Sequence, residues 1–231
     1  MKNHLLGCIV FIVSIAVSLA QESTGYRITG RITGLDDDVK VYLSRGTKRI
    51  DSASVKDGEF ILAGSLIEPA FMYLYTGKGR ESKKLADILL DNRELMVTGT
   101  KPDYDHVRVS GSDIDEQWRD WYDHDQHLGY QRHRLNQVYQ SLLGKKDTAS
   151  ANVLKQLGNE LMADRINMLK SYVKRYHNSA SGAVLPTLCT LQDRLSRSDY
   201  MEMYEVLTPE MQNTEMGREI IKQANKAKST R

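Results

Sequence analysis

Cysteine is scarce in this sequence: Cys8 and Cys189 are the two cysteines among 231 residues. They lie near opposite ends of the chain, so the sequence contains neither a Cys-x-x-Cys redox motif nor a cysteine-based zinc motif. Cys189 lies in the apolar segment Leu185–Leu191, where a cysteine usually packs as a small hydrophobic residue. No cationic residue stands close in sequence to activate the thiol, so we expect a buried and unreactive Cys189.

Neither sign of charge dominates, since 32 Lys and Arg residues are balanced by 30 Asp and Glu residues. There is no basic run with interleaved aromatic residues, which argues against nucleic-acid binding. Catalytic signatures are also missing, because no Gly-x-Ser-x-Gly nucleophile elbow and no paired zincin histidines occur. Gly77-Lys78-Gly79-Arg80 lacks the spacing of a phosphate-binding loop and fits a turn between strands. The sequence therefore predicts no catalytic residues and no cofactor.

Long apolar runs are missing after residue 20. Before it, a short basic start leads into the apolar stretch Leu5–Leu19, and Ser18-Leu19-Ala20 provides the small residues that a signal peptidase requires. We therefore expect residues 1–20 to be a signal peptide, with export to the periplasm or cell envelope and no transmembrane span after cleavage. Cys8 precedes the apolar stretch, whereas a lipoprotein cysteine follows it, so we do not expect lipid anchoring at Cys8.

The rest of the chain divides into two parts by its apolar period. Across residues 21–111 the apolar residues mostly alternate, as in Tyr26–Ile32, and this period of two predicts β-strands. Asp57-Gly58, between two such runs, is typical of a β-hairpin turn. Short strands separated by Gly, Asp and Pro indicate an antiparallel β-sandwich.

Residues 112–231 show a helical period instead. Apolar residues recur every seven positions at Trp121, Leu128, Leu135 and Leu142, and a second stripe follows at Leu154, Leu157, Leu161, Met168 and Tyr172. The segment Gly144–Thr148 between the stripes has the length of a turn that joins antiparallel helices. The expected fold class is therefore α+β. An N-terminal antiparallel β-sandwich domain over residues 21–111 precedes a helical domain over residues 112–231 that contains a long antiparallel helical hairpin.

Several segments resemble one uncharacterised domain family. The resemblance rests on Tyr26–Gly30, Val41–Leu43, Ile50–Phe60, Val109–Ser112 and Leu207–Arg218. The family is the β-sandwich domain of unknown function that precedes a thioredoxin-like domain, of the TlpA/ResA or peroxiredoxin-like (AhpC/TSA-like) kind, in exported bacterial proteins. The resemblance implies a fold, an exported location, and an envelope protein with a thioredoxin-like domain as a partner. The catalytic Cys-x-x-Cys of those proteins has no matching position here, so we expect no disulfide reductase activity.

One cluster contains residue types that bind metals. On a helix, Asp120, His124 and His127 lie at positions i, i+4 and i+7 of one face, which is a usable spacing for zinc or another divalent ion. The alternative is a solvated helix face whose acids and bases balance locally, and this is the default expectation. A calcium loop that starts at Asp123 does not fit, because its twelfth position is Arg134 instead of glutamate.

Two further features concern packing of the first long helix. Asp125 and Arg132 lie on its apolar seam, and they either pair across the hairpin and set its register or face solvent where the seam opens. Trp118 and Trp121 are the two tryptophans of the chain and follow closely after the expected end of the sandwich. Because tryptophan carries a large apolar surface, we expect at least one of them to pack against the sandwich.

These expectations describe a non-catalytic, exported binding or interaction protein of the cell envelope, with a thioredoxin-like envelope protein as its companion. Two alternatives stay open. One is an envelope enzyme or metal-binding protein with an unrecognised site near His124 and His127. The other is a truncated relative with little residual function.

Overall fold

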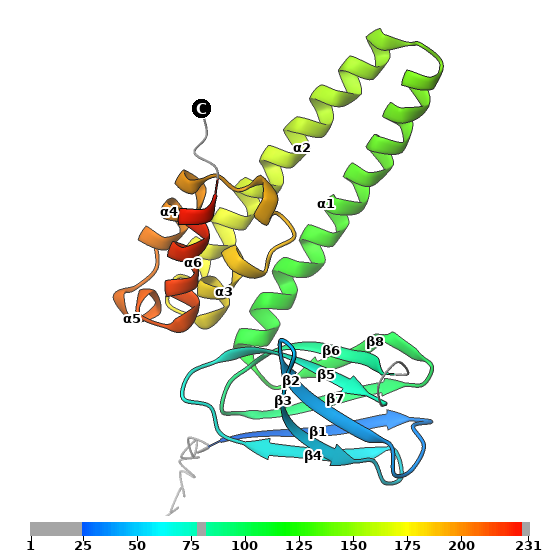
Figure 1. Ribbon diagram of the computed structural model, residues 1–231, viewed down its shortest axis with the longest axis vertical. Coiled ribbons are helices and arrows are strands. Elements are labelled where there is room, and N and C mark those ends of the chain that lie inside the picture. Colours follow the sequence, from blue (N-terminus) through cyan, green and yellow to red (C-terminus); the bar gives the residue numbers. More distant parts are fainter. Residues whose placement is uncertain (1–24, 78–81, 228–231) are drawn as a thin grey trace, which may run out of the picture.

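The computed structural model describes residues 25–77 and 82–227 of the chain. The expected signal peptide at residues 1–20, which includes Cys8, lies outside these residues. Within them, two four-stranded β-sheets are followed by helices, which confirms the expected α+β class. The sheets stack at one end of the molecule, and a long pair of helices rises from them (Figure 1).

The eight described strands form two sheets of four. Their bounds are β1 Tyr26–Thr33, β2 Lys40–Arg45, β3 Lys48–Ser54, β4 Glu59–Gly64, β5 Ala70–Thr76, β6 Lys83–Leu90, β7 Glu94–Thr100 and β8 Asp103–Ser110. The strand orders are β4-β1-β7-β8 and β3-β2-β5-β6. All neighbouring strands are antiparallel except β1 and β7, which run parallel. A parallel pair requires a crossover connection, and here the segment between β1 and β7 contains the four strands of the second sheet and also β4 of the first.

The core of the sandwich lies between the two sheets because apolar residues alternate along the strands. In β1, Ile28 and Ile32 are fully buried, whereas Arg27 and Arg31 are exposed. Leu74 of β5 belongs to the same cluster of buried side chains from the second sheet. Full burial of one such side chain contributes about 1.5–3 kcal/mol relative to leaving it in water.

The turn at Asp57-Gly58 joins the two layers. Asp57 and Gly58 have φ of +53° and +75°, and Lys56 and Glu59 exchange two backbone hydrogen bonds of 2.9 Å. The tight turn is therefore confirmed, since both central residues adopt positive φ. Beyond the turn the hairpin prediction is wrong, because β3 and β4 diverge into different sheets.

The helical part begins with the expected antiparallel hairpin. The bounds are α1 Asp113–Gly144, α2 Thr148–Arg175, α3 Ala180–Leu188, α4 Arg197–Glu205, α5 Pro209–Gln212 and α6 Glu215–Lys226, with a short 3-10 helix at Gln192–Arg194. Asp147 caps the start of α2 by accepting a hydrogen bond of 3.1 Å from the Ser150 backbone N–H. No helix of the described residues is long and apolar enough to cross a membrane.

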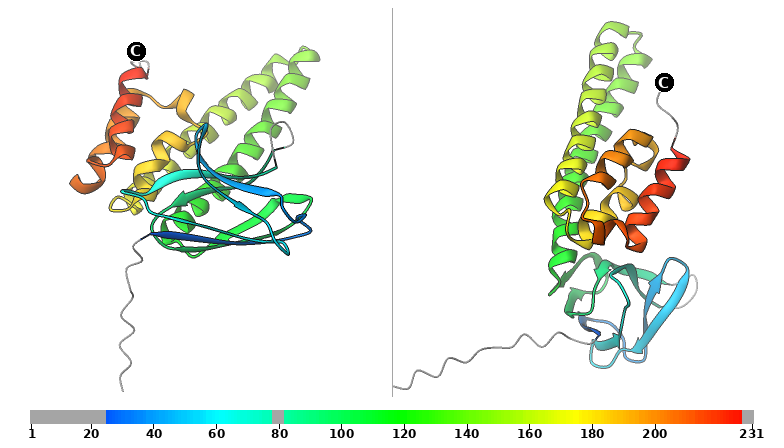
Figure 2. Two further views of the ribbon diagram at one scale, coloured as in Figure 1. Left: turned by 60° about the horizontal axis from the view of Figure 1, so that its bottom comes forward. Right: turned by 90° about the vertical axis from the view of Figure 1, so that its left-hand side faces the viewer.

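The later helices pack on the base of the hairpin and leave its far end uncovered. Helix α3 contacts both α1 and α2, while α4 and α6 pack on each other. In Figure 2, right, the hairpin forms one border of the molecule. The sandwich and the helices α3 to α6 both lie on the same side of it. One side of the hairpin therefore faces away from the rest of the protein.

A buried carboxylate joins α1 to the sandwich. Asp115, which is 1% exposed, accepts a hydrogen bond of 2.8 Å from the backbone N–H of Leu89 in β6. Arg119 donates to the other Asp115 oxygen at 2.6 Å and also to the backbone carbonyl of Asp87. Burial raises the pKa of the Asp115 carboxyl, and the charge of Arg119 opposes that rise. The first turns of α1 are thus bound to the edge strand of the second sheet.

The two tryptophans complete this junction. Trp118 is 3% exposed and meets Phe71 of β5 edge to face, with ring centroids 5.0 Å apart. Trp121 is fully buried in the helical core, to which Leu89 of β6 also belongs. The expectation that at least one tryptophan packs against the sandwich is therefore confirmed. Aromatic pairs of this geometry add about 0.5–1.5 kcal/mol beyond the area that they bury.

Candidate functional site

Asp120 and His124 lie beside each other on α1, as expected. Tyr172 of α2 completes the group. The Nδ1 atom of His124 is 2.8 Å from both the Asp120 backbone oxygen and the Tyr172 hydroxyl, and 3.4 Å from Asp120 Oδ1. Arg175 lies over the Tyr172 ring at 4.8 Å. Burial and the nearby Asp120 carboxylate raise the pKa of Tyr172 to about 12. The hydroxyl therefore stays protonated at neutral pH and holds α2 against α1.

His127 does not join this group. Its Nε2 atom lies 2.9 Å from the side-chain nitrogen of Gln131, one turn further along α1. His133 lies beside Gln137 in the same way, at 3.1 Å. Across residues 25–77 and 82–227, no three His, Cys, Asp or Glu residues are placed so that they could hold a metal ion. The geometry near His124 thus resembles a polar helix–helix contact more than a metal centre.

The polar seam residue Asp125 is buried and paired. Arg165 of α2 binds both of its carboxylate oxygens at 2.8 Å, and the Thr190 hydroxyl donates a third hydrogen bond of 2.8 Å. The side chains of Asp125 and Arg165 are 0% and 7% exposed. Asp125 therefore does pair across the hairpin, as one of the two alternatives predicted, but its partner is Arg165. Arg132 is half-buried and takes no part.

The sequence contains a signal for Arg165 that appears only when the two apolar stripes are compared. The apolar stripe of the second helix passes from Leu161 to Met168, and position 165 falls in the gap between them. A basic residue at that gap faces the acidic seam position of the other helix, because residues four apart share a helix face. Asp125 interrupts the apolar stripe of the first helix, and Arg165 interrupts that of the second. Comparison of the two stripes therefore predicts the contact.

Cys189 is buried, as expected from its apolar surroundings. It is 3% exposed, and its Sγ lies 3.5 Å from the carbonyl oxygen of Pro186. Burial raises the pKa of the Cys189 thiol to about 12. Since the thiolate is the reactive form, this thiol is inert at neutral pH.

The distal part of the hairpin, residues 130–161, has a different character from its base. Helix α1 has no fully buried side chain beyond Asp125. Val138 is 51% exposed, Leu157 44% and Val153 66%. Scattered exposed apolar residues are normal on a protein surface, but several on adjoining helix turns indicate a contact surface.

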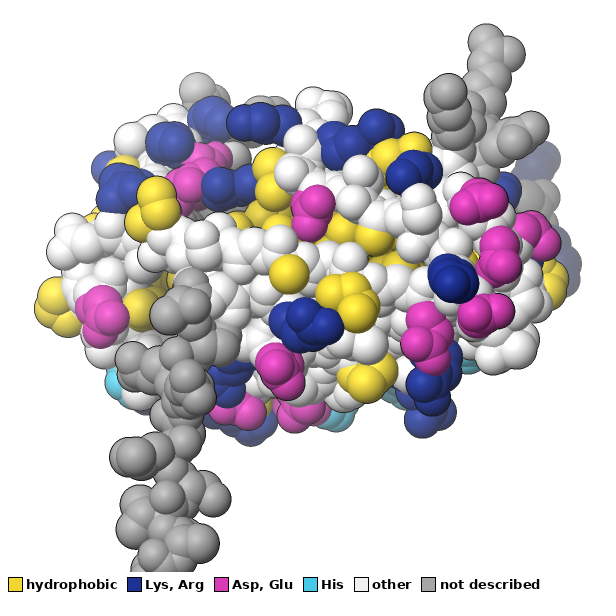
Figure 3. Space-filling view, turned by 90° about the horizontal axis from the view of Figure 1, so that it is seen from below, with side chains coloured by type: hydrophobic (Ala, Val, Ile, Leu, Met, Phe, Trp, Pro, Cys, Tyr) yellow, Lys and Arg dark blue, Asp and Glu magenta, His cyan; other side chains and the backbone are white. Residues whose placement is uncertain are grey.

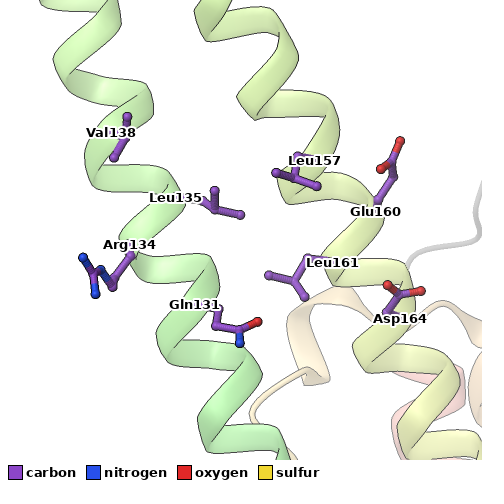
Figure 4. Close-up of a pocket in the computed structure, with 8 residues that line it drawn as sticks. All are labelled: Gln131, Arg134, Leu135, Val138, Leu157, Glu160, Leu161 and Asp164. Carbon is purple, nitrogen blue, oxygen red and sulfur yellow. The ribbon is translucent and has the colours of Figure 1, made fainter.

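An apolar groove follows this distal part between the two helices. The outer groove, as we call it, encloses about 450 Å³ and is lined by Gln131, Arg134, Leu135, Val138, Leu157, Glu160, Leu161 and Asp164. In Figure 4 the leucines point into the groove, and the helices that follow α2 lie behind it. The outer groove therefore opens on the side of the hairpin that faces away from α3 to α6.

The other side of the hairpin holds a smaller depression. The inner groove, of about 200 Å³, is lined by Arg132, Leu135, Asn136, Tyr139, Leu154, Lys155, Gly158 and Asn159. Leu143 continues this side one turn beyond Tyr139 and is 40% exposed. Leu135 borders both grooves, so a single layer of side chains separates them.

Among the described residues, the face of the sandwich opposite the hairpin exposes fewer large apolar side chains than the hairpin does. Ile61 of β4 and Met96 of β7 are 48% and 45% exposed and flank Thr29 of β1 in the sheet register. Figure 3 shows this end of the molecule, where hydrophobic side chains alternate with Lys, Arg, Asp and Glu. The hairpin is therefore the better candidate for an interaction surface.

Comparison with known families finds a match for the N-terminal part. Residues 26–118 match the family described as Domain of unknown function (DUF4369), which confirms the expected resemblance to an uncharacterised N-terminal domain family. The match covers the whole sandwich and continues into α1 as far as Trp118, so it includes two of the residues that anchor this helix to the sheet, Asp115 and Trp118. A search of the curated proteins finds no match.

Proposed function

We propose that this protein is a non-catalytic, exported binding protein of the cell envelope that docks another polypeptide with its distal hairpin. The observation that carries the proposal is the exposure of apolar side chains on the distal hairpin, among them Leu143, which lies on the side of the inner groove. Exposed apolar residues gathered on a projecting element favour a protein contact. The partner that we propose is an envelope protein with a thioredoxin-like domain, because the domains that this sandwich resembles precede one.

The absence of catalysis is part of the proposal. Asp115 and Asp125 are both buried, and each is paired with an arginine and with at least one further hydrogen-bond donor. Such pairs serve structure, since a carboxylate that is fully hydrogen-bonded has little capacity left for a substrate. The inert thiol of Cys189 fits the same interpretation.

The inner groove is the side that we assign to the partner. Tyr139 and Leu154 are half-buried there, and Leu143 adds an exposed apolar side chain toward the tip of the hairpin. A partner on this side also meets the helices α3 to α6, which lie on the same side of the hairpin (Figure 2). The contact area is then larger than the hairpin alone provides.

Site-specific photo-crosslinking in the producing cell tests the proposal. A photo-reactive amino acid replaces Leu143, and in a control variant it replaces Ile61, which has a similar exposed fraction on the far face of the sandwich. We expect the Leu143 variant to give an adduct with a second polypeptide that mass spectrometry identifies as a thioredoxin-like protein, and the Ile61 variant to give none. Equal labelling from both positions, or no adduct from Leu143, argues against hairpin docking.

A further inference from the structure

The outer groove carries a continuous apolar strip along the distal hairpin. Helix α1 contributes Leu135 and Val138, and α2 contributes Leu157 and Leu161. Val153 extends the strip by one more turn of α2, because it lies four residues before Leu157. In the part of the chain that the structure describes, no third layer of helices covers this face of the hairpin, whereas α3 to α6 cover the base of α1 and α2 on the other side.

The two borders of the outer groove have opposite charge. Arg134 stands on the α1 border, and Glu160 and Asp164 stand on the α2 border, pointing outward at about the same level (Figure 4). Within the described part of the chain none of the three forms an ion pair: Arg134 lies 6.0 Å from the Tyr130 ring, and Glu160 accepts one hydrogen bond from Gln156. The strip is therefore apolar in the middle, basic on one border and acidic on the other.

This pattern is complementary to itself, and we propose that the outer groove binds the outer groove of a second copy of this chain. The two hairpins lie face to face and point the same way, related by a two-fold axis parallel to their helices. Such an axis places α1 of each copy against α2 of its partner. Each residue keeps its height along the axis, so residues at the same height in the two copies face each other. Arg134 then faces the partner's Glu160 and Asp164, and the four helices form an antiparallel bundle around the leucines and valines.

The charges select this arrangement over the alternative. If the hairpins pointed in opposite directions, the two-fold axis would lie across the helices and would place α1 against α1 and α2 against α2. Arg134 would then meet its own counterpart, and the acidic border would meet another acidic border. Like charges that face each other across an interface oppose association.

The rest of the molecule leaves room for the second copy. The sandwich and the helices α3 to α6 both lie on the opposite side of the hairpin in Figure 2, right. A partner on the free side therefore reaches the outer groove from the tip of the hairpin to its base. The inner groove stays open in this dimer, so self-association and docking of a different protein use separate surfaces.

Sedimentation equilibrium of the exported protein, with charge reversals, tests the dimer. We expect a dimer, and at least about a tenfold weaker association for Arg134→Glu alone or Glu160→Arg alone, because each places like charges in contact. The double variant Arg134→Glu/Glu160→Arg is expected to recover part of the lost association, since the pairing of positions 134 and 160 is restored with the signs exchanged while Asp164 keeps its charge. Circular dichroism verifies that each variant is folded. A wild-type monomer at all concentrations, or a double variant no better than the singles, overturns the proposal.

Disulfide trapping tests the direction of the hairpins. Val138→Cys and Val153→Cys are prepared as separate variants, mixed and oxidised, while the buried Cys189 stays unreactive. We expect a covalent dimer that joins one variant to the other, because α1 of one copy lies on α2 of its partner. Dimers that form only within each single variant, or photo-crosslinks from Val153 to a different polypeptide, would contradict the arrangement. The Leu143 experiment reports on the inner side, so either proposal can fail alone.

Discussion

The ion pair between Asp125 and Arg165 provides the sharpest test of how the hairpin is held together. Each side chain is buried, and their two mutual hydrogen bonds are joined by those that Thr190 makes to both of them. We consider three variants: Asp125→Leu, Arg165→Met and the combination of both. The single variants leave one charge buried without its counter-ion, whereas the double variant leaves an apolar contact.

The expected magnitudes follow from desolvation. Removing one partner of a buried ion pair lowers the free energy of unfolding by about 3–5 kcal/mol, because the remaining charge has lost both water and its partner. Arg165 without Asp125 keeps only the Thr190 hydroxyl, which cannot neutralise it. Replacing both residues by apolar side chains of similar volume is often neutral or stabilising, so the double variant is expected to be far less damaged than the sum of the singles.

Urea unfolding, followed by circular dichroism, measures these differences. At roughly 2–4 °C per kcal/mol for a chain of this length, each single variant also melts about 6–20 °C below the wild type. Arg31→Met is the matched control, since the Arg31–Glu59 pair has side chains that are 71% and 51% exposed, and its loss changes stability by less than about 1 kcal/mol. Single variants that behave like this control, or costs that simply add in the double variant, would refute the reasoning.

Three further predictions concern the junction, the thiol and the N-terminus. Trp118→Ala is expected to lower the free energy of unfolding by about 3–5 kcal/mol, because the ring packs on Phe71. The chain is expected to melt in one transition, and two separate transitions in calorimetry would show that the sandwich and the helical part unfold independently. Cys189, with a pKa of about 12, is expected to resist alkylation at pH 9 in the folded state and to react after denaturation; mass spectrometry that finds rapid modification of folded protein would contradict its burial. Mass spectrometry of protein from the producing cell is expected to find Gln21 as the mature N-terminus, and an intact Met1 would argue against export.

The sequence pattern predicted the secondary-structure elements better than it predicted which elements lie next to each other. Alternation along Tyr26–Ile32 predicted a strand with one buried face, and the seven-residue spacing of Trp121, Leu128 and Leu135 predicted a long helix. Alternation does not specify which strand lies alongside, so the parallel pairing of β1 with β7 could not be derived from it. The same limit explains Asp57-Gly58, where the local turn was predictable but the divergence of the two strands was not.

Contacts between polar residues were the least predictable part of the candidate sites. Asp115 lies in the first turn of α1, where an acidic residue is common because it interacts with the helix dipole, so nothing in the sequence distinguished it. Its role depends on Leu89, which is distant in sequence and belongs to another layer. Asp125 was recognisable as a polar residue on an apolar seam, but identifying Arg165 required both helices to be compared. The spacing of Asp120, His124 and His127 was compatible with a metal site, yet it did not reveal the tyrosine beside His124.

The contact between Asp115 and β6 has a consequence for solubility. An edge strand with free backbone N–H and C=O groups is a template for pairing with another chain, and proteins protect such edges with charges or by covering them. The second sheet uses both means: its β3 edge carries the exposed Lys48 and Arg49, and its β6 edge is covered by the start of α1. A fragment that ends at Ser110 would therefore expose β6 and is expected to aggregate. A fragment that extends through Arg119 would keep this edge covered.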